Sequence, residues 1–154
     1  MDKIKQKIEA AGRSLPPCIA PAYAYQSVAI HGEIAYVSGH VPKTESGDLH
    51  PGKVGRDITL DQARAAAELA TLNALSSLGD ALGGLDRVER VVKLVVFVAS
   101  GEGFNEQPKV AEAASTLLNV AFGVNPGHAR SAVGVAELPR NSSVEVEMVA
   151  VVKT

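Results

Sequence analysis

Five stretches of the chain have the apolar pattern of β-strands. They cover residues 25–30, 33–38, 88–99, 128–136 and 144–152. The dipeptide His31-Gly32 separates the first two stretches at the spacing of a tight hairpin. The third and fifth stretches are apolar on both sides over most of their length, which is typical of strands covered on both faces of a sheet.

Two longer stretches have the period of an α-helix. The first covers residues 59–78 and begins with a capping box, in which Thr59 and Gln62 satisfy free backbone N–H groups. The second covers residues 104–122. Residues 1–20 are expected to form an N-terminal helical extension. Residues 1–12 space apolar side chains as a helix does and end at Gly12, and the prolines at 16, 17 and 21 then predict an extended lead-in. The predicted order of the main elements is β-β-α-β-α-β-β.

This order predicts an α+β fold in which two helices pack on one face of a mixed sheet. A chain of 154 residues has the size of one domain, so residues 1–154 are expected to form a single domain. Residues 43–55 are rich in Gly, Pro, Ser and Asp and are expected to form a loop. Since two helices cover only one face of the sheet, the other face is expected to be buried in a homo-oligomer.

The composition narrows the classes of partner. The net charge is −2 at pH 7 and the positive residues are scattered, which argues against nucleic acid as a partner. The single cysteine, Cys18, leaves no partner for an intramolecular disulfide. No apolar stretch approaches the roughly 20 residues of a membrane span, and the first residues lack the apolar core of a secretory signal. The expected compartment is the cytoplasm, with no membrane partner.

Three motifs carry the candidate chemistry. They are residues 36–42 (YVSGHVP), 128–139 (HARSAVGVAELP) and 144–147 (VEVE). In order and spacing they resemble the motifs of the RidA/YjgF family, for which an older label is endoribonuclease L-PSP. The resemblance covers residues 25–152, nearly the whole chain.

The resemblance implies a chorismate-mutase-like fold and a homotrimer with three clefts between subunits. Family members with deaminase activity hydrolyse reactive 2-imino acids to 2-keto acids and ammonia. The family's arginine on the RS strand, which clamps the substrate carboxylate, corresponds to Arg130. The first glutamate of VEVE is Glu145, which positions or activates the attacking water. Further substrate contacts are implied for Tyr25, Ser38, Gly39 and Ala132.

The chemistry of these side chains suits that role. A guanidinium offers a planar fork that matches a carboxylate, and imine hydrolysis then needs a located water and a carboxylate to take its proton. Neither a metal nor an organic cofactor is required. Two alternatives stay open: Arg130 can instead pair with Glu145 or Glu147 across neighbouring strands, and Tyr23 competes with Tyr25 on the same face of its segment.

The chain departs from the family pattern at three positions. His40 stands in place of a glutamine, Ala132 in place of a cysteine and Glu112 in place of an asparagine. An added carboxylate near the cleft would repel an acidic substrate or select a different one. His40, Glu112 and His128 are therefore candidates for lining the pocket, the last because it shares a strand face with Arg130. None of the four histidines has the spacing of a metal site.

Three functions compete. The first is a cofactor-free deaminase of small enamine or imine carboxylates. The second is a non-catalytic trimer that binds a small acid or a protein partner, which the departures at His40 and Glu112 favour. The third is an endoribonuclease, and the lack of a basic stripe and the low aromatic content argue against it.

Overall fold

Five strands form one mixed sheet in the order β1-β2-β7-β5-β6. The computed structural model describes residues 1–153. The strands are β1 (Val28–His31), β2 (Ile34–His40), β5 (Val88–Ala99), β6 (Ala129–Val135) and β7 (Val144–Val152). Strands β5 and β6 pair in parallel, and all the other pairs in the sheet are antiparallel. The predicted α+β class and the predicted element order are confirmed.

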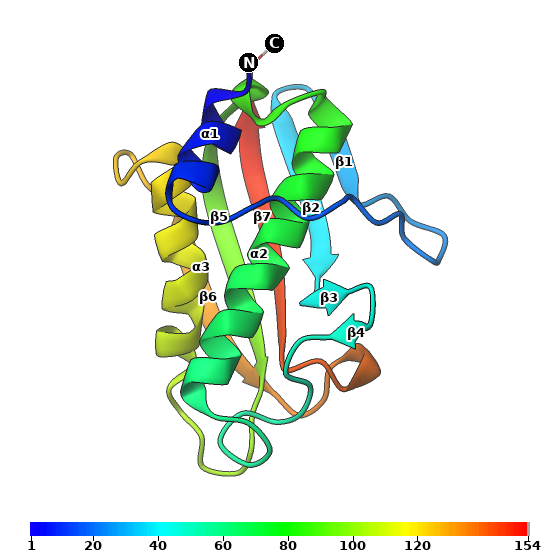
Figure 1. Cartoon of the computed structure of the whole chain (residues 1–154), viewed down its shortest axis with the longest axis vertical. Coiled ribbons are helices and arrows are strands. Elements are labelled where there is room, and N and C mark those ends of the chain that lie inside the picture. The colour runs from blue at the N-terminus through cyan, green and yellow to red at the C-terminus, as the bar shows by residue number, and fades with distance from the viewer. Residues whose placement is uncertain (154) are drawn as a thin grey trace.

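Two long helices pack on the same face of the sheet (Figure 1). Helix α2 spans Leu60–Leu82 and helix α3 spans Gln107–Phe122. The capping box is present: the Thr59 backbone N–H donates to Oε1 of Gln62 at 2.9 Å, and the Gln62 N–H donates to Oγ1 of Thr59 at 3.2 Å. Helix α2 continues four residues past its predicted end and stops at Gly83, which has the left-handed conformation (φ 74°).

The N-terminal extension is helical over only part of its length. Helix α1 spans Lys3–Ala10, within the helical stretch predicted for residues 1–12. Three prolines lie between residues 16 and 21, and they favour an extended backbone. This extended segment crosses helix α2, where the Ser76 hydroxyl donates to the Pro16 carbonyl at 2.7 Å (Figure 1).

Two short connections differ from the predicted ones. The turn between β1 and β2 consists of Gly32 and Glu33, one residue later than predicted. Gly32 has a positive φ, which a two-residue hairpin turn requires at its first position. The segment 43–55 contains a small hairpin, β3 (Lys43–Thr44) and β4 (Gly47–Asp48), where the sequence predicted only a loop. Short helical turns η1 (Leu85–Arg87) and η2 (Pro139–Asn141) precede β5 and β7.

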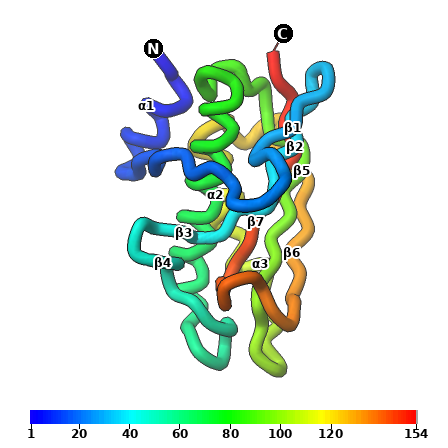
Figure 2. Tube along the Cα trace, turned by 90° about the vertical axis from the view of Figure 1, so that its right-hand side faces the viewer, coloured from blue at the N-terminus to red at the C-terminus, as the bar shows by residue number. Residues whose placement is uncertain are grey.

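The two faces of the sheet are buried to different extents. In β7, alternate residues from Val144 to Val152 face the helices and are buried, whereas those between them are half-buried or exposed. On this open face Tyr36 is 53% exposed and Val133 is 42% exposed. Figure 2 shows the helices on one side of the sheet, with no part of residues 1–153 on the other. The apolar residues of β5 and β7 therefore lie on both faces of the sheet. Those on one face pack against the helices, and those on the other lie on an open face.

Candidate active site

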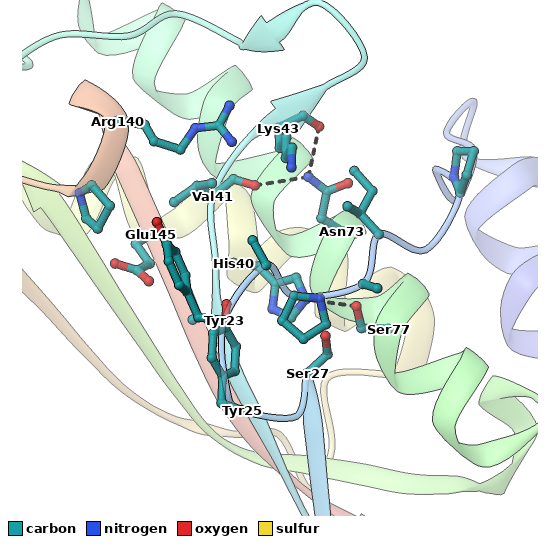
Figure 3. A pocket seen from close by; sticks show the side chains of 17 residues that line it. Tyr23, Tyr25, Ser27, His40, Val41, Lys43, Asn73, Ser77, Arg140 and Glu145 are labelled. Carbon is teal, nitrogen blue, oxygen red and sulfur yellow. Dashed lines mark hydrogen bonds between the residues drawn. The ribbon is translucent and has the colours of Figure 1, made fainter.

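A pocket of about 280 Å³ opens beside the carboxyl end of β2 (Figure 3). Four separate parts of the chain line it: the extended segment before β1, the end of β2 with the residues after it, one face of α2, and the turn that leads into β7. The polar and aromatic residues among the lining are Tyr23, Tyr25, Ser27, His40, Lys43, Asn73, Ser77, Arg140 and Glu145.

A bulge in β2 brings the backbone of Gly39 against the side chain of Glu145. The pairing of β2 with β7 shifts register between Val37 and His40, so Gly39 lies in the irregular part. A Cβ atom at position 39 would lie 2.9 Å from Cδ of Glu145 and would overlap one of its carboxylate oxygens. Any other residue at this position would therefore displace the Glu145 carboxylate from the place it takes beside Gly39.

Glu145 is a half-buried carboxylate on the open face of β7, next to the pocket. It has no hydrogen-bond or ion-pair partner among residues 1–153. Burial raises the pKa of Glu145 above its ordinary value, and the negative charge of Glu147 on the same strand face raises it further. A carboxylate with free lone pairs and a raised pKa is suited to take a proton from a bound water.

His40 joins the end of β2 to helix α2. Its Nδ1 lies 2.7 Å from the Ser38 carbonyl, and its Nε2 lies 2.8 Å from Oγ of Ser77. Burial lowers the pKa of His40, so the ring is neutral at pH 7. A carbonyl only accepts hydrogen bonds, so Nδ1 carries the proton and Nε2 accepts from the Ser77 hydroxyl. His40 thus forms part of the pocket wall, and both its ring nitrogens are engaged.

The remaining residues predicted near this pocket are placed as follows. Tyr25 and Tyr23 both line it, so the two candidate tyrosines are brought together. The Ser38 hydroxyl donates to the Gln26 carbonyl at 2.7 Å, and Ser38 is not among the lining residues of this pocket. Its side chain instead faces a shallow hollow on the open face of the sheet.

Arg130, Glu112 and His128 form a second group, on the edge made by β6 and α3. Nη1 of Arg130 donates to Oε2 of Glu112 at 2.9 Å and to Oγ of Ser115 at 3.2 Å. His128 Nε2 lies 2.9 Å from the same Ser115 hydroxyl. Burial and the nearby charge of Arg130 lower the pKa of His128. Ala132 follows on the same strand face, where Arg130 and Ala132 pair with Leu94 and Val96 of β5.

Within one chain these two groups do not share a cavity. Arg130 and Ala132 are not among the residues that line the pocket beside Glu145. The alternative in which Arg130 pairs with Glu145 or Glu147 is not what the structure shows, because its carboxylate partner is Glu112. The Arg130 side chain keeps 25% of its surface exposed, at the free edge of the sheet. A site that uses both groups needs two copies of the chain.

Three lining residues, Lys43, Asn73 and Arg140, were not among the candidates predicted from sequence. Asn73 lies on the buried, alanine-rich face of α2, and a polar side chain there is the one signal that could have drawn attention. Lys43 and Arg140 come from a hairpin and a turn that meet only in the folded chain. Among residues 1–153, no cluster of three or more His, Cys, Asp or Glu residues is placed to hold a metal ion. No helix in the same range has the length and apolar character of a membrane span.

Comparisons with known proteins agree with the motifs. The family model described as endoribonuclease L-PSP matches residues 17–152. Protein TCP17 of Trypanosoma cruzi is 43% identical over 94% of this chain and 91% of its own length. The crystal structure of Atu1372 from Agrobacterium tumefaciens, a protein described as having unknown function, superposes with a TM-score of 0.88 at 38% identity, covering 97% of this chain and 92% of that one.

A third relative has a stated activity. The 2-iminobutanoate/2-iminopropanoate deaminase of Dermatophagoides farinae is 28% identical over 91% of this chain and 94% of its own length. The match of the family model over most of the chain, with relatives that cover nearly their full lengths, establishes the family. The chain belongs to the endoribonuclease L-PSP family, which is the RidA/YjgF family.

Proposed function

We propose that this protein hydrolyses small 2-imino acids, and their enamine tautomers, to 2-keto acids and ammonia in clefts between the subunits of a homotrimer. Arg130 of one subunit holds the substrate carboxylate, and Glu145 of its neighbour activates the water. The observation that carries the proposal is Glu145 itself. It is a half-buried carboxylate without a partner among residues 1–153, placed beside a bulged glycine in the pocket at the end of β2. The deaminase among the relatives supports the same reaction class.

The reaction needs only proton transfers at one carboxylate. Glu145 takes a proton from water while the water oxygen bonds to C2 of the protonated imine, which gives a carbinolamine. Glu145 then returns this proton to the nitrogen. As the C–N bond breaks, the carbinolamine hydroxyl gives its proton to Glu145, and the proton passes to the departing ammonia. The products are a 2-keto acid and an ammonium ion, and Glu145 ends as it began.

Glu145→Gln is expected to lower kcat/KM for 2-imino acids by about a hundredfold, which is the usual effect of losing a general base. The amide keeps the shape of the side chain but takes no proton. The measurement uses 2-imino acids formed in the cuvette by an amino-acid oxidase, with semicarbazide as the competing trap. The matched control is Glu147→Gln, on the same strand face but outside this pocket. Equal losses in both variants would contradict the role of Glu145.

The pH dependence offers a second test of the same residue. A general base is active when deprotonated, so kcat/KM should fall as the pH drops through the pKa of Glu145, which lies above the ordinary range of a glutamate. Glu147→Gln removes the repulsive charge and lowers the pKa of Glu145. The acid limb of the pH profile should therefore move to lower pH in this variant. A limb that does not move would assign the titration to another group.

One observation favours a second function, a trimer that binds small acids without turnover. Glu112 already accepts a hydrogen bond from Arg130, and a substrate carboxylate must compete with it. This function predicts saturable binding of a 2-keto acid together with unchanged decay of 2-imino acids in the wild-type assay. The oxidase-coupled measurement therefore separates the two functions directly.

A further inference from the structure

We propose that Lys43 and Arg140 form a second anion-binding position in the pocket, and that the substrates are 2-imino acids with a second anionic group on the side chain. The inference rests on the proposed function, because it takes Arg130 of another copy as the partner of the first carboxylate. It names the substrate class of the same cleft.

Two positive side chains meet at one end of the pocket. Lys43 and Arg140 both line it, and Figure 3 shows their charged ends on the same side, away from Tyr25. The Lys43 ammonium has no hydrogen-bond or ion-pair partner among residues 1–153. Arg140 donates to Oδ1 of Asp48 through Nη2 at 3.0 Å, while its Nη1 and Nε have no partner in the same range. The N–H groups of the Lys43 ammonium and of Nη1 and Nε of Arg140 thus have no acceptor among residues 1–153.

Buried partners hold the backbone that carries Lys43 and the guanidinium of Arg140. The Asn73 amide donates to the carbonyls of Val41 and Lys43 at 3.0 and 3.1 Å, which fixes the backbone that carries Lys43. The side chain of Asp48 is 3% exposed and also accepts from the Ser142 hydroxyl. The small hairpin of β3 and β4 pairs Lys43 with Asp48, so it supplies one cation and the anchor of the other.

The backbone at Arg140 is also unusual. Arg140 and Asn141 have φ values of 62° and 59°, which place two successive residues other than glycine in the left-handed region. Such a conformation costs free energy and is found most often at functional sites and ligand clamps. Two hydrogen bonds maintain it, from the Ser142 N–H to the Pro139 carbonyl at 3.1 Å and from the Gly52 N–H to the Asn141 carbonyl at 2.8 Å.

The size and the charge of the pocket agree with a larger acid. A volume of about 280 Å³ approaches the lower limit of pockets for drug-sized ligands, about 300 Å³, and exceeds the needs of an imino acid with one or two side-chain carbons. In Figure 3 Tyr25 lies at the opposite end from Lys43, and Glu145, beside which the imine carbon would react, lies between the two ends. A side chain that extends from C2 toward Lys43 and Arg140 meets two cations and one buried carboxylate, Asp48.

Stable 2-keto acids test the inference on the full-length assembled protein. Isothermal titration compares 2-oxobutanoate, which has one carboxylate, with 2-oxoglutarate, which has two. The wild type is expected to bind 2-oxoglutarate about tenfold more tightly, as one charge-assisted hydrogen bond would give. A third probe, a 2-keto acid that ends in phosphate, shows which of the two anions fits the position better, and tighter binding of either supports it.

The variants Arg140→Gln and Lys43→Gln should each lower this ratio of affinities, and the double variant should bring it close to one. Lys109→Gln is the matched control, because Lys109 pairs with Glu106 on an exposed part of α3, outside the pocket. Melting temperatures confirm that each variant is folded.

The inference is overturned if the wild type binds 2-oxoglutarate and 2-oxobutanoate equally tightly. It is also overturned if the double variant has the same ratio of affinities as the wild type. Arg130→Ala separates this failure from failure of the proposed function. It should weaken binding of both keto acids alike, and unchanged binding of both would overturn the role of Arg130 instead.

Discussion

Arg130→Ala is expected to lower kcat/KM for 2-imino acids by about 10³-fold while the chain still folds and assembles. A guanidinium that grips a carboxylate with two charge-assisted hydrogen bonds contributes about 1.5–3 kcal/mol through each of them. The loss of folding stability should be small, because the ion pair of Arg130 with Glu112 is partly exposed and such pairs contribute at most about 1 kcal/mol. The oxidase-coupled assay gives the rate, and thermal unfolding gives the stability.

Two further variants distinguish loss of a substrate contact from loss of an ion pair. Arg13→Ala removes another arginine that pairs with a glutamate, Glu68, far from either group of candidate residues, and should leave the rate unchanged. Glu112→Gln removes the internal competitor for Arg130 and should tighten the binding of a 2-keto acid. If Glu112→Gln damages activity as much as Arg130→Ala does, the pair is a structural ion pair and the proposed role of Arg130 is wrong.

Tyr36→Glu is expected to break the trimer into monomers and to abolish deaminase activity with it. Tyr36 lies on the open face of the sheet, opposite Val149 of β7 and beside Val95 in a shallow hollow. We propose that other copies of the chain cover this face. A carboxylate introduced there would lose its water in a hollow that Glu147 lines together with Lys93, and its burial under another copy costs several kcal/mol in each subunit. Light scattering coupled to size exclusion measures the mass of the assembly.

The control for this variant lies off the proposed interface. Val124 is 67% exposed in the connection between α3 and β6, and Val124→Glu should change neither the mass nor the rate. If Tyr36→Glu retains the mass of the wild type, the open face is not the interface. A monomeric Tyr36→Glu that remains fully active would contradict a cleft between subunits.

The main elements of the fold could be predicted because each has a strong local pattern. The apolar pattern of residues 144–152 and the capping box at Thr59 each depend on neighbouring residues only, and the strand and the start of the helix lie where the sequence predicts them. The predicted end of α2 at residue 78 is four residues too early, because Gly79 continues the helix and lies close to Leu85. A contact between residues of different elements, such as this one, cannot be predicted from a local sequence pattern.

The candidate site could be predicted only in part, for a similar reason. Glu145 and Gly39 belong to motifs of the family, and the register shift in β2 brings them together. Lys43 lies in the small β3–β4 hairpin and Arg140 in the turn before β7. Their proximity depends on the contact of Arg140 with Asp48 and on the left-handed backbone at Arg140 and Asn141. The separation of Arg130 from Glu145 within one chain follows from the position of β6 at the sheet edge, which the strand order decides.

If the proposed trimer forms, this separation predicts that a chain lacking one of the two side chains is complemented by a chain lacking the other. If each cleft takes its guanidinium from one subunit and its carboxylate from the next, Arg130→Ala and Glu145→Gln damage opposite sides of it. Chains of the two inactive variants, unfolded together and refolded in equal amounts, should recover activity in about one quarter of the clefts, the share expected for random mixing in a ring. The mixed assembly would then have deaminase activity although each variant alone is inactive.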